Sequence, residues 1–422
     1  MLIKNKKNEQ TLWNNAVKLM PRGTQTLSKC PDQFVDGVYP KFAKKSKGAY
    51  IKGLDNKWYL DFMCGLGPII LGYNHKRTNR AIKKELKNGI VHSLPTLLEQ
   101  ELAELICEVV PCAEQVRFAK NGTDADLAAV RIARSYTKRE HIVVCGYHGW
   151  GDWHGALIRD YGIPKSMKKI VSSFEYNNLK SLETELKKRP VAAVVMEAQA
   201  LTAPKKGFLK GVRKLCDKYK TLLIFDEVVS GFRWSLGGAQ EYFGVTPDLC
   251  CLGKALANGM PLSAIAGKKE YMQELNHAFF SMTFGGECLS LSAAIETIKE
   301  LKKKDYNYLW DLGNLLDEGI KKSAKKYGLK INFAGSAPRH NLSFDSKHKD
   351  PSGMKALFYQ EMVKQGILFP NVIYIQFSHT KKDIIKTIKA ADNAFKYVKD
   401  NIDNIDNVLE GKKSIEIFRK NT

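Results

Sequence analysis

The sequence predicts an α/β fold built on a mainly parallel β-sheet. From about residue 115 to residue 270, short apolar segments alternate with segments of helical periodicity. Within each apolar segment, apolar residues do not alternate with polar ones. The segment VAAVVMEAQ, residues 191–199, is apolar at almost every position. Strands of this kind are buried on both faces, as in parallel sheets that helices cover on both sides. Polar residues follow several of these strands, and such sheets carry their sites at the carboxyl edge.

Each element of this region has its own signal. The negative first turn of the helix expected at 124–137 suits the helix dipole, and the helix expected at 207–220 is amphipathic. The expected strands, each read together with the polar turn that follows it, are VRFAKNGT at 116–123, HIVVCGYHGW at 141–150, VAAVVMEAQ at 191–199, TLLIFDEV at 221–228 and DLCCLGKA at 248–255.

The two ends of the chain predict a second, smaller α+β domain. A short N-terminal helix stops at Pro21-Arg22-Gly23, and alternating residues at 48–62 indicate a β-hairpin. The other expected elements are helices at 97–109, 306–330, 351–366 and 383–401 and a strand at 373–380. We expect residues 1–75 and 306–422 to contribute to the small domain and residues 76–305 to form the large one.

Composition narrows the class of protein. The 422 residues are 44% hydrophobic, which excludes a disordered chain, and no apolar run is long enough to span a bilayer. The net charge of +23 comes mostly from lysines spread over helix faces, so we interpret it as a solvated surface rather than a nucleic-acid site. Nine scattered cysteines without a CxxC pair, and no signal peptide, indicate a reduced cytoplasmic protein without a metal site.

Chemically capable side chains stand where the strands end. Taken singly, each has an ordinary structural reading: a helix cap, a surface lysine or a turn. If the sheet is real, however, they converge on one edge. The residues are Asn121, Gly122, Thr123, Tyr147, His148, Glu197, Asp226, Glu227 and Lys254.

This set meets the needs of one cofactor, pyridoxal 5'-phosphate. A lysine amine kept from water becomes nucleophilic and can form a Schiff base with a carbonyl, which suits Lys254. A carboxylate such as Asp226 can hold a pyridine nitrogen protonated. The helix start after Gly122 and Thr123 suits a phosphate, while Tyr147 and Val228 can sandwich a flat ring.

The segment LLIFDEVVSGFRWSLGGAQEYFGVTPDLCCLGKALANGMPLSAIAGKKEYM, residues 222–272, resembles the signature of class III aminotransferases. It is most similar to the glutamate-1-semialdehyde 2,1-aminomutase-like branch. The likeness also covers LMPRGTQTLSK, YLDFMCGLGPIILGYNH, FAKNGTDADLAAVRIARSYT, GYHGW and FSMTFGGECLSLSAA in order. The resemblance implies the fold type I of pyridoxal-phosphate-dependent transferases and a homodimer with its active site at the interface.

The resemblance also implies a role for each site residue. Lys254 would be the Schiff-base lysine and proton shuttle, and Asp226 the partner of the pyridine nitrogen. Tyr147 would stack on the ring, Val228 would back it, and Glu197 would sit near its hydroxyl. The remaining cofactor contacts would be Asn121, Gly122 and Thr123 at the phosphate, His148 in the loop of Tyr147, and Thr283, which would reach the phosphate of the neighbouring subunit.

The substrate side departs from the family. Thr26 and Lys29 stand where aminomutases carry a serine and an arginine for the substrate carboxylate, so the bidentate arginine fork is lost. Gly65-Leu66 replaces a Ser-Trp pair, and Glu287 stands where most relatives carry asparagine. Lys120 replaces the first asparagine of the phosphate turn, and Ala198 replaces a proline. Arg339 and His379 are further candidates for substrate contact.

These departures predict an aminotransferase with a small-molecule amino-acid donor, expected to be L-glutamate, and a keto or aldehyde acceptor. The acceptor hypothesis is a keto-sugar or another surface-glycan precursor. An intramolecular glutamate-1-semialdehyde 2,1-aminomutase is the alternative. A non-catalytic cofactor-binding protein would have lost Lys254 or Asp226, and both are present. We expect no specific nucleic-acid partner and no membrane insertion.

Overall fold

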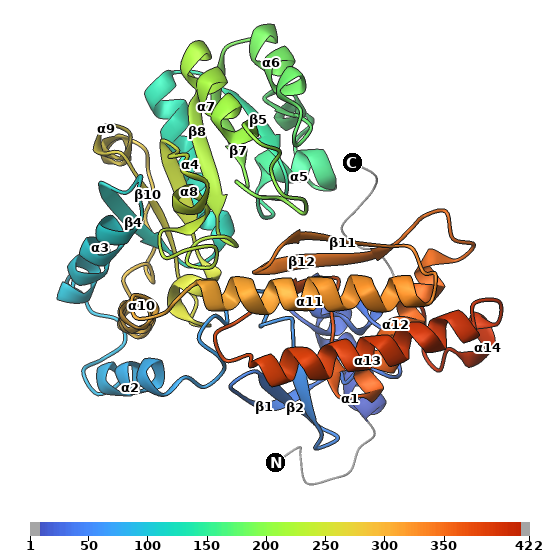
Figure 1. Cartoon of the computed structure of the whole chain (residues 1–422). Helices are drawn as coiled ribbons and strands as arrows, with labels where there is room; N and C mark the ends of the chain where they lie inside the picture. The colour runs from blue at the N-terminus through green and yellow to red at the C-terminus, as the bar shows by residue number, and fades with distance from the viewer. Residues whose placement is uncertain (1–8, 415–422) are drawn as a thin grey trace. The chain divides into compact units, whose positions relative to one another are not determined.

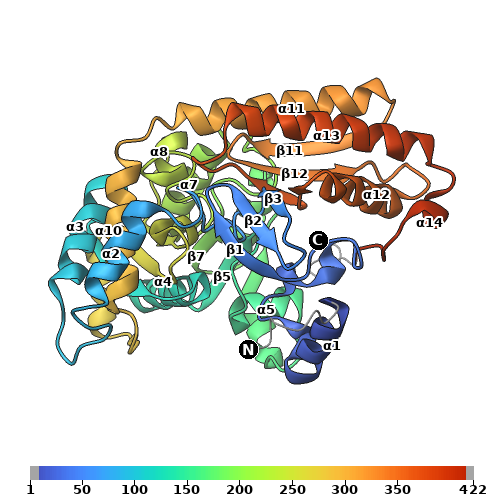
Figure 2. The ribbon, with the colours of Figure 1, turned by 90° about the horizontal axis from the view of Figure 1, so that it is seen from below.

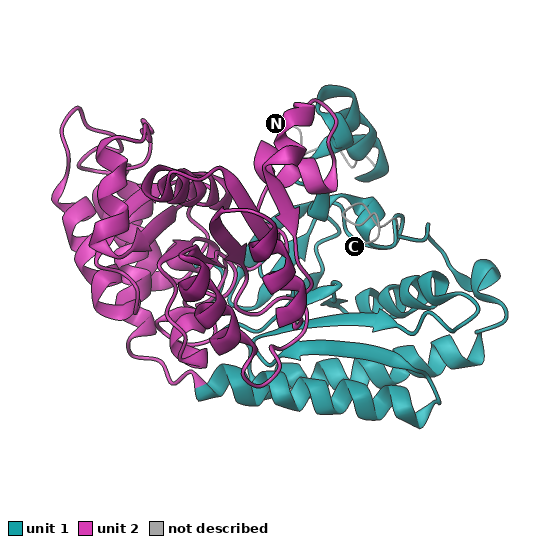
Figure 3. Cartoon of the chain, turned by 90° about the horizontal axis from the view of Figure 1, so that it is seen from above, with its two compact units in different colours: residues 1–66, 72–74, 307–422 teal, residues 67–71, 75–306 magenta. Residues whose placement is uncertain are grey.

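The computed structural model describes residues 9–414, and the chain divides into two compact units (Figure 3). Unit 1 takes in residues 1–66, 72–74 and 307–422, so it is made from both ends of the chain. Unit 2 takes in residues 67–71 and 75–306. Each unit has its own sheets and helices, and the strand-end residues of the candidate site all belong to unit 2.

Unit 2 is built on one mixed sheet with the strand order β4–β10–β9–β8–β7–β5–β6. Strands β9, β8, β7, β5 and β6 run parallel, whereas β10 is antiparallel to both of its neighbours, β4 and β9. The prediction of a mainly parallel sheet is confirmed, and β10 is an addition to it. The strands are β4 (Gln115–Ala119), β5 (His141–Cys145), β6 (Val171–Ser173), β7 (Val191–Met196), β8 (Leu222–Glu227), β9 (Leu249–Leu252) and β10 (Ser263–Gly267).

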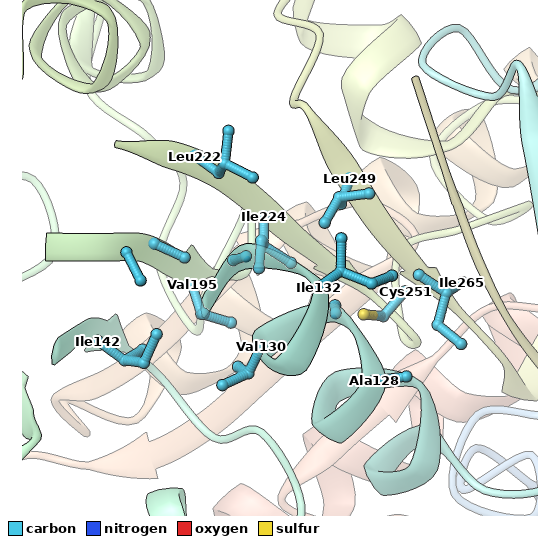
Figure 4. Packing of buried hydrophobic residues seen from close by; sticks show 14 of the residues in the cluster. Ala128, Val130, Ile132, Ile142, Val195, Leu222, Ile224, Leu249, Cys251 and Ile265 are labelled. Carbon is cyan, nitrogen blue, oxygen red and sulfur yellow. The ribbon is translucent and has the colours of Figure 1, made fainter. Parts of the chain in front are cut away.

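Helix α4 (Gly122–Thr137) packs its apolar face on this sheet (Figure 4). Its residues Ala128, Val130 and Ile132 meet strand residues such as Val195, Ile224 and Cys251, all of them buried. The strand residues in between point to the other face by alternation and are also buried, for example Val143, Val194 and Leu223. Helices α6 (Leu179–Lys188) and α7 (Phe208–Tyr219) pack against β5 and β8.

The other helices of unit 2 lie around this core. Helix α3 occupies the predicted range, and a capping box of Thr96 and Glu99 defines its start. Helix α10 packs against both α2 and α3. The bounds are α2 (Lys76–Glu85), α3 (Leu97–Val109), α5 (Asp152–Ile158), α8 (Gly238–Phe243), α9 (Lys269–Met272) and α10 (Cys288–Leu301).

Unit 1 contains two small sheets and the long C-terminal helices. The predicted hairpin is β2 and β3, in a sheet of order β1–β2–β3–β13, and the second sheet has the order β11–β12–β14. Helices α11 and α13 lie side by side (Figures 1 and 2). The bounds are α1 (Glu9–Leu19), β1 (Ala43–Lys47), β2 (Tyr50–Gly53), β3 (Trp58–Asp61), α11 (Asn307–Lys326), β11 (Ile331–Ser336), β12 (Arg339–Phe344), α12 (Pro351–Lys364), β13 (Ile367–Leu368), β14 (Val372–Tyr374), α13 (Lys381–Asp400) and α14 (Ile405–Val408).

The strand predicted at 373–380 is wrong beyond Tyr374. The chain turns there, and the Gln376 backbone N–H donates to His379 Nδ1 at 3.2 Å. Thr380 then caps α13 by accepting from the Asp383 backbone N–H. The short local hydrogen bonds of this turn replace the strand ladder that the sequence predicts there.

All nine cysteines are free thiols, and only Cys107 is partly exposed. Two of the buried ones, Cys30 and Cys64, lie in unit 1, and the others lie in unit 2. Among the described residues, no helix has both the length and the apolar character needed to cross a membrane.

Candidate active site

Lys254 and Asp226 stand at the carboxyl ends of two neighbouring parallel strands. Asp226 on β8 pairs in register with Cys251 on β9, and Lys254 follows three residues later at the start of a 3₁₀ turn. The backbone of Lys254 is in the left-handed region, with φ of 41°. This conformation costs free energy for a residue that has a side chain, and such strain concentrates at functional sites.

The Lys254 side chain is half-buried. Among residues 9–414, its amine has no hydrogen-bond or ion-pair partner. Most lysines of this chain either extend into water or pair with a carboxylate. An amine that is held at a strand end without a partner is available to attack a carbonyl.

Asp226 is buried, and both of its carboxylate oxygens are engaged. Oδ1 accepts from the Val228 backbone N–H at 3.0 Å, and Oδ2 lies 2.8 Å from His148 Nδ1. His148 is fully buried and stacks on Trp153, with ring centroids 6.1 Å apart. The carboxylate is therefore fixed in orientation before any ligand binds to it.

The two ring nitrogens of His148 have different partners. His148 Nε2 lies 3.1 Å from the carbonyl oxygen of Cys145, which can only accept, so Nε2 carries a hydrogen. Nδ1 lies 2.8 Å from Asp226 Oδ2. His154 stays neutral, because its Nε2 accepts from the His148 backbone N–H and burial lowers its pKa to about 3.

The turn at residues 121–123 forms the start of α4, and it is closely packed. Asn121 is the N-cap in a capping box with Asp124. A Cβ atom on Gly122 would lie 2.9 Å from both Cγ atoms of Val228, and one on Gly149 would lie 2.0 Å from Thr123 Oγ1. The first N–H groups of a helix have no acceptor within it. The start of α4, in a turn that leaves no room for a side chain at position 122, fits a phosphate.

Three other cofactor candidates come from separate segments of unit 2. Tyr147 follows β5, is 51% exposed, and meets His154 edge-on with ring centroids 5.5 Å apart. Glu197 follows β7, and its Oε1 would lie 3.7 Å from a Cβ on Gly146. Thr283 is exposed in the segment that leads into α10. A pyridoxal ring stacked on Tyr147 and held by Asp226 is compatible with these positions.

The four substrate candidates fall on both units. Thr26 and the exposed Lys29 lie on a short 3₁₀ turn of unit 1, and the buried Arg339 begins β12 of the same unit. Glu287, on unit 2, caps α10 by accepting from the backbone N–H groups of Leu289 and Ser290.

Glu287 also forms an ion pair with Lys120 at 2.8 Å. Burial alone would raise the pKa of Glu287, but hydrogen bonds from Lys120 and Ser290, together with the Lys120 charge, bring it below its usual value. The pairing of these two residues was not predicted, although both had been noted as departures from the family.

Two strand-end residues have structural contacts instead. His379 is buried, stacks on Phe62, and has its Nε2 3.1 Å from the Asp61 carbonyl oxygen. Glu227 is fully buried and accepts from the backbone N–H groups of Ala239 and Gln240. Both side chains hold loops of the fold together.

Sequence reasoning missed the His148–Asp226 hydrogen bond and a second buried carboxyl, Asp126 on α4. The signal for Asp126 was available: a charged residue stands among alanines on the apolar face of a helix. No sequence signal indicates the contact of His148 with Asp226, because the two residues are 78 positions apart.

Comparison with solved structures agrees with this fold. The FumI protein of Sphingopyxis sp. MTA144, solved in its pyridoxal-phosphate internal aldimine form, has a TM-score of 0.88 and 27% identity, and the match covers 94% of this chain and 97% of that one. Fold and site together define a pyridoxal-phosphate-dependent transferase of fold type I, and pyridoxal 5'-phosphate is its cofactor.

The chain belongs to the class-III aminotransferase family, whose family model matches residues 35–375. It is 35% identical to the 3-aminobutyryl-CoA aminotransferase of Cloacimonas acidaminovorans, over 92% of this chain and 97% of the relative. It is 34% identical to the glutamate-1-semialdehyde 2,1-aminomutase of Fusobacterium nucleatum, over 93% of this chain and 98% of that relative.

Proposed function

We propose that this protein is an intermolecular aminotransferase that takes the amino group of L-glutamate and passes it to a keto or aldehyde acceptor. The observation that supports catalysis is the half-buried Lys254 amine, which has no partner among the described residues and stands on the strand next to Asp226. A purely cofactor-storing protein would have no need of an unpaired amine under backbone strain.

Each residue of the site has one task in this proposal. Bound pyridoxal phosphate supplies an electron sink. Lys254 would hold the cofactor through its carbonyl carbon, with loss of water, and would move a proton at the substrate carbon. Asp226 binds the ring nitrogen, with His148 fixing its orientation. The N-terminus of α4 binds the phosphate, assisted by Asn121 and Thr123.

The choice of an intermolecular reaction rests on the substrate side. Lys29 cannot make the two parallel hydrogen bonds of an arginine, and Leu66 replaces a tryptophan of the aminomutase branch. Leu66 lies in the left-handed region, with φ of 78°, in a tight loop after Asp61. The 35% identical relative is an aminotransferase by name. The aminomutase remains the second candidate because relatives of 34% identity carry that name.

For the acceptor we propose a keto-sugar or related glycan precursor, with Thr26, Lys29, Glu287 and Arg339 as substrate contacts. The exposed Lys29 is the most accessible of the four. A panel should contain keto-sugars, 3-oxoacyl thioesters and glutamate semialdehyde, each with L-glutamate as donor. Amine formation from keto-sugars supports this acceptor class. Formation only from a thioester contradicts it, and conversion of the semialdehyde without a donor favours the aminomutase.

We also propose a cytoplasmic homodimer with its active site at the interface. Large apolar side chains are exposed on unit 2 around the segment that carries Thr283 and in the connection between α2 and α3. A second copy of this chain would cover them. They are Leu86, Ile90, Val91, Leu94, Leu97, Phe279 and Phe284. Light scattering should give twice the chain mass, and Leu94→Glu with Leu97→Glu should produce monomers that do not transaminate.

The first experiment is the visible absorbance spectrum of the purified protein before and after L-glutamate, without an acceptor. A yellow band that bleaches while 2-oxoglutarate appears supports a glutamate-dependent aminotransferase. A yellow band that glutamate leaves unchanged contradicts the proposed donor. The Lys254→Ala variant is the control, because it removes the covalent attachment and keeps the rest of the site.

A further inference from the structure

A second carboxyl, that of Asp126, is buried next to the site and has no role in the contacts described above. Its side chain is on α4, the helix whose start forms the phosphate turn, and the residue is 2% exposed. Its Oδ1 has no hydrogen-bond partner among the described residues. Buried carboxyl oxygens are nearly always paired, so this one calls for an explanation.

Helical geometry directs Asp126 toward the ring-nitrogen end of the site. Asp126 is four residues after Gly122, so the two lie on one face of the helix. Gly122 faces Val228, which follows β8. The Asp126 carboxyl interacts with the thiol of Cys251, which is the residue paired in register with Asp226 on the neighbouring strand. Neighbours in register point to the same face of a sheet.

Within residues 9–414, no cation is among the groups that act on Asp126. The groups that act on it are the Asp226 carboxylate on β8, the Cys251 thiol on β9 and the Glu197 carboxylate after β7, and it acts in turn on the Tyr147 hydroxyl after β5. Burial first, and then the charges of Asp226 and Glu197, raise the pKa of Asp126 well above its usual range. The Cys251 hydrogen bond opposes this rise in pKa only in part, so burial favours the protonated form of the Asp126 carboxyl.

The Asp226 carboxylate already has a partner without Asp126. His148 Nδ1 lies 2.8 Å from Asp226 Oδ2. A pyridine ring that is protonated at its nitrogen brings one further positive charge into a buried place. A neutral carboxylic acid beside it can compensate by losing its proton.

We propose that Asp126 is a second counter-ion for the protonated cofactor ring: it holds a proton in the cofactor-free protein and releases that proton when the ring binds. The proposal rests on the proposed contact between Asp226 and the ring nitrogen. Asp126 does not touch the reacting atoms; it is a positioning residue that acts through Asp226. Its negative charge makes the ring nitrogen harder to deprotonate and so supports the electron sink.

Calorimetry of pyridoxal phosphate binding tests this, in buffers of different ionisation enthalpy near neutral pH. The wild-type protein should release about one proton more per chain than Asp126→Asn, because the amide cannot ionise. Asp217→Asn is the matched control, since Asp217 is an exposed carboxylate on α7 and its loss should leave the proton count unchanged. Equal proton counts in wild type and Asp126→Asn would overturn the proposal.

A spectroscopic titration measures a pH midpoint that would not change if Asp126 had only a structural role. Removal of a buried negative charge makes bound cations easier to deprotonate, so the pH midpoint of the visible absorbance change should fall by about one unit in Asp126→Asn. An unchanged midpoint contradicts the proposal. Failure of the proposed cofactor contacts would look different, because Lys254→Ala would then keep its yellow colour after desalting, or Asp226→Asn would leave the midpoint unchanged.

Infrared difference spectroscopy on the wild type keeps the test valid if Asp126→Asn does not fold. Binding of the cofactor should remove the carbonyl band of a protonated carboxylic acid. Isotopic labelling of aspartate alone should shift that band, which separates it from the buried Glu227, whose pKa burial also raises. A spectrum without loss of an aspartic acid band would contradict proton release from Asp126.

Discussion

The ammonium of Lys120 lies 2.8 Å from the carboxylate of Glu287, so an ion pair links the phosphate turn to the first turn of α10. Both side chains are largely buried, at 17% and 10% exposed. Lys120 also donates to the Pro261 carbonyl oxygen at 3.1 Å. Both residues stand where the family carries asparagine, so the two departures compensate one another.

A double-mutant cycle should measure this compensation. Lys120→Asn and Glu287→Asn should each lower the free energy of unfolding by about 1–3 kcal/mol, because each leaves a poorly solvated partner charge. The double variant should lose less than the sum, by about 1 kcal/mol, since asparagine is still a good N-cap for α10. Denaturant unfolding measures all four proteins.

The same variants separate a structural role of Glu287 from substrate binding. If Glu287 acts only through Lys120, the double variant should keep the acceptor KM of the wild type. Strict additivity of the two single changes would mean that the ion pair contributes nothing. A large KM increase in Glu287→Asn alone, without loss of stability, would favour substrate contact.

Lys254→Ala should abolish transamination, with a loss of at least about 10³-fold in kcat, because both the covalent attachment and the proton transfer depend on this amine. The variant should also lose its yellow colour on desalting. Lys269→Met, at an exposed lysine in α9, should keep colour and activity. Retained covalent cofactor in Lys254→Ala would assign the attachment to another lysine.

Gly122→Ala should weaken cofactor binding, because its new Cβ would lie 2.9 Å from both Cγ atoms of Val228. Val228→Ala removes those two atoms. The double variant should therefore bind pyridoxal phosphate more tightly than Gly122→Ala alone, and fluorescence titration measures each dissociation constant. If the double variant binds no better, the defect comes from the phosphate turn itself and not from the contact with Val228.

Acid should destabilise unit 1 through His340. Burial lowers the pKa of His340 to about 4, and its Nε2 lies 3.1 Å from the Gly313 carbonyl oxygen. The unfolded chain binds the proton near pH 6.5, so stability is lost as the pH falls from about 6.5 to 4, by up to about 1.4 kcal/mol per pH unit.

His340→Gln should be less stable at pH 7 but should lose less stability on acidification. Thermal melts between pH 7 and pH 4.5 measure the difference, and His277→Gln, at an exposed histidine, is the control. A parallel pH dependence in wild type and His340→Gln would contradict this assignment.

The sequence predicted elements best where local signals agree. Helix α3 was placed at residues 97–109 because its apolar periodicity is clear, and its Thr96–Glu99 box confirms the start. The sequence does not single out strand β10, because four of the five residues in Ser263–Gly267 are small and the segment carries little pattern of its own. Their antiparallel direction follows from tertiary pairing with β4 and β9.

In the candidate site, too, features with a local sequence signal could be predicted and contacts between distant segments could not. The sequence places Lys254, Asp226 and the turn at Gly122 at one edge, because each stands at or just after the carboxyl end of a strand. Contacts between distant segments could not be predicted. The pairing of His148 with Asp226, and of Lys120 with Glu287, needs the folded chain, since no local pattern relates residues so far apart in sequence.

The buried cysteine thiols can be used to detect local opening of the folded structure. Eight of the nine cysteines are buried, so a thiol reagent can label them only when the surrounding structure separates. Cys30 and Cys64 report on one unit, and six others report on the second. Pulse labelling followed by peptide mass spectrometry would therefore time the opening of each unit in the unmodified chain, without any introduced probe.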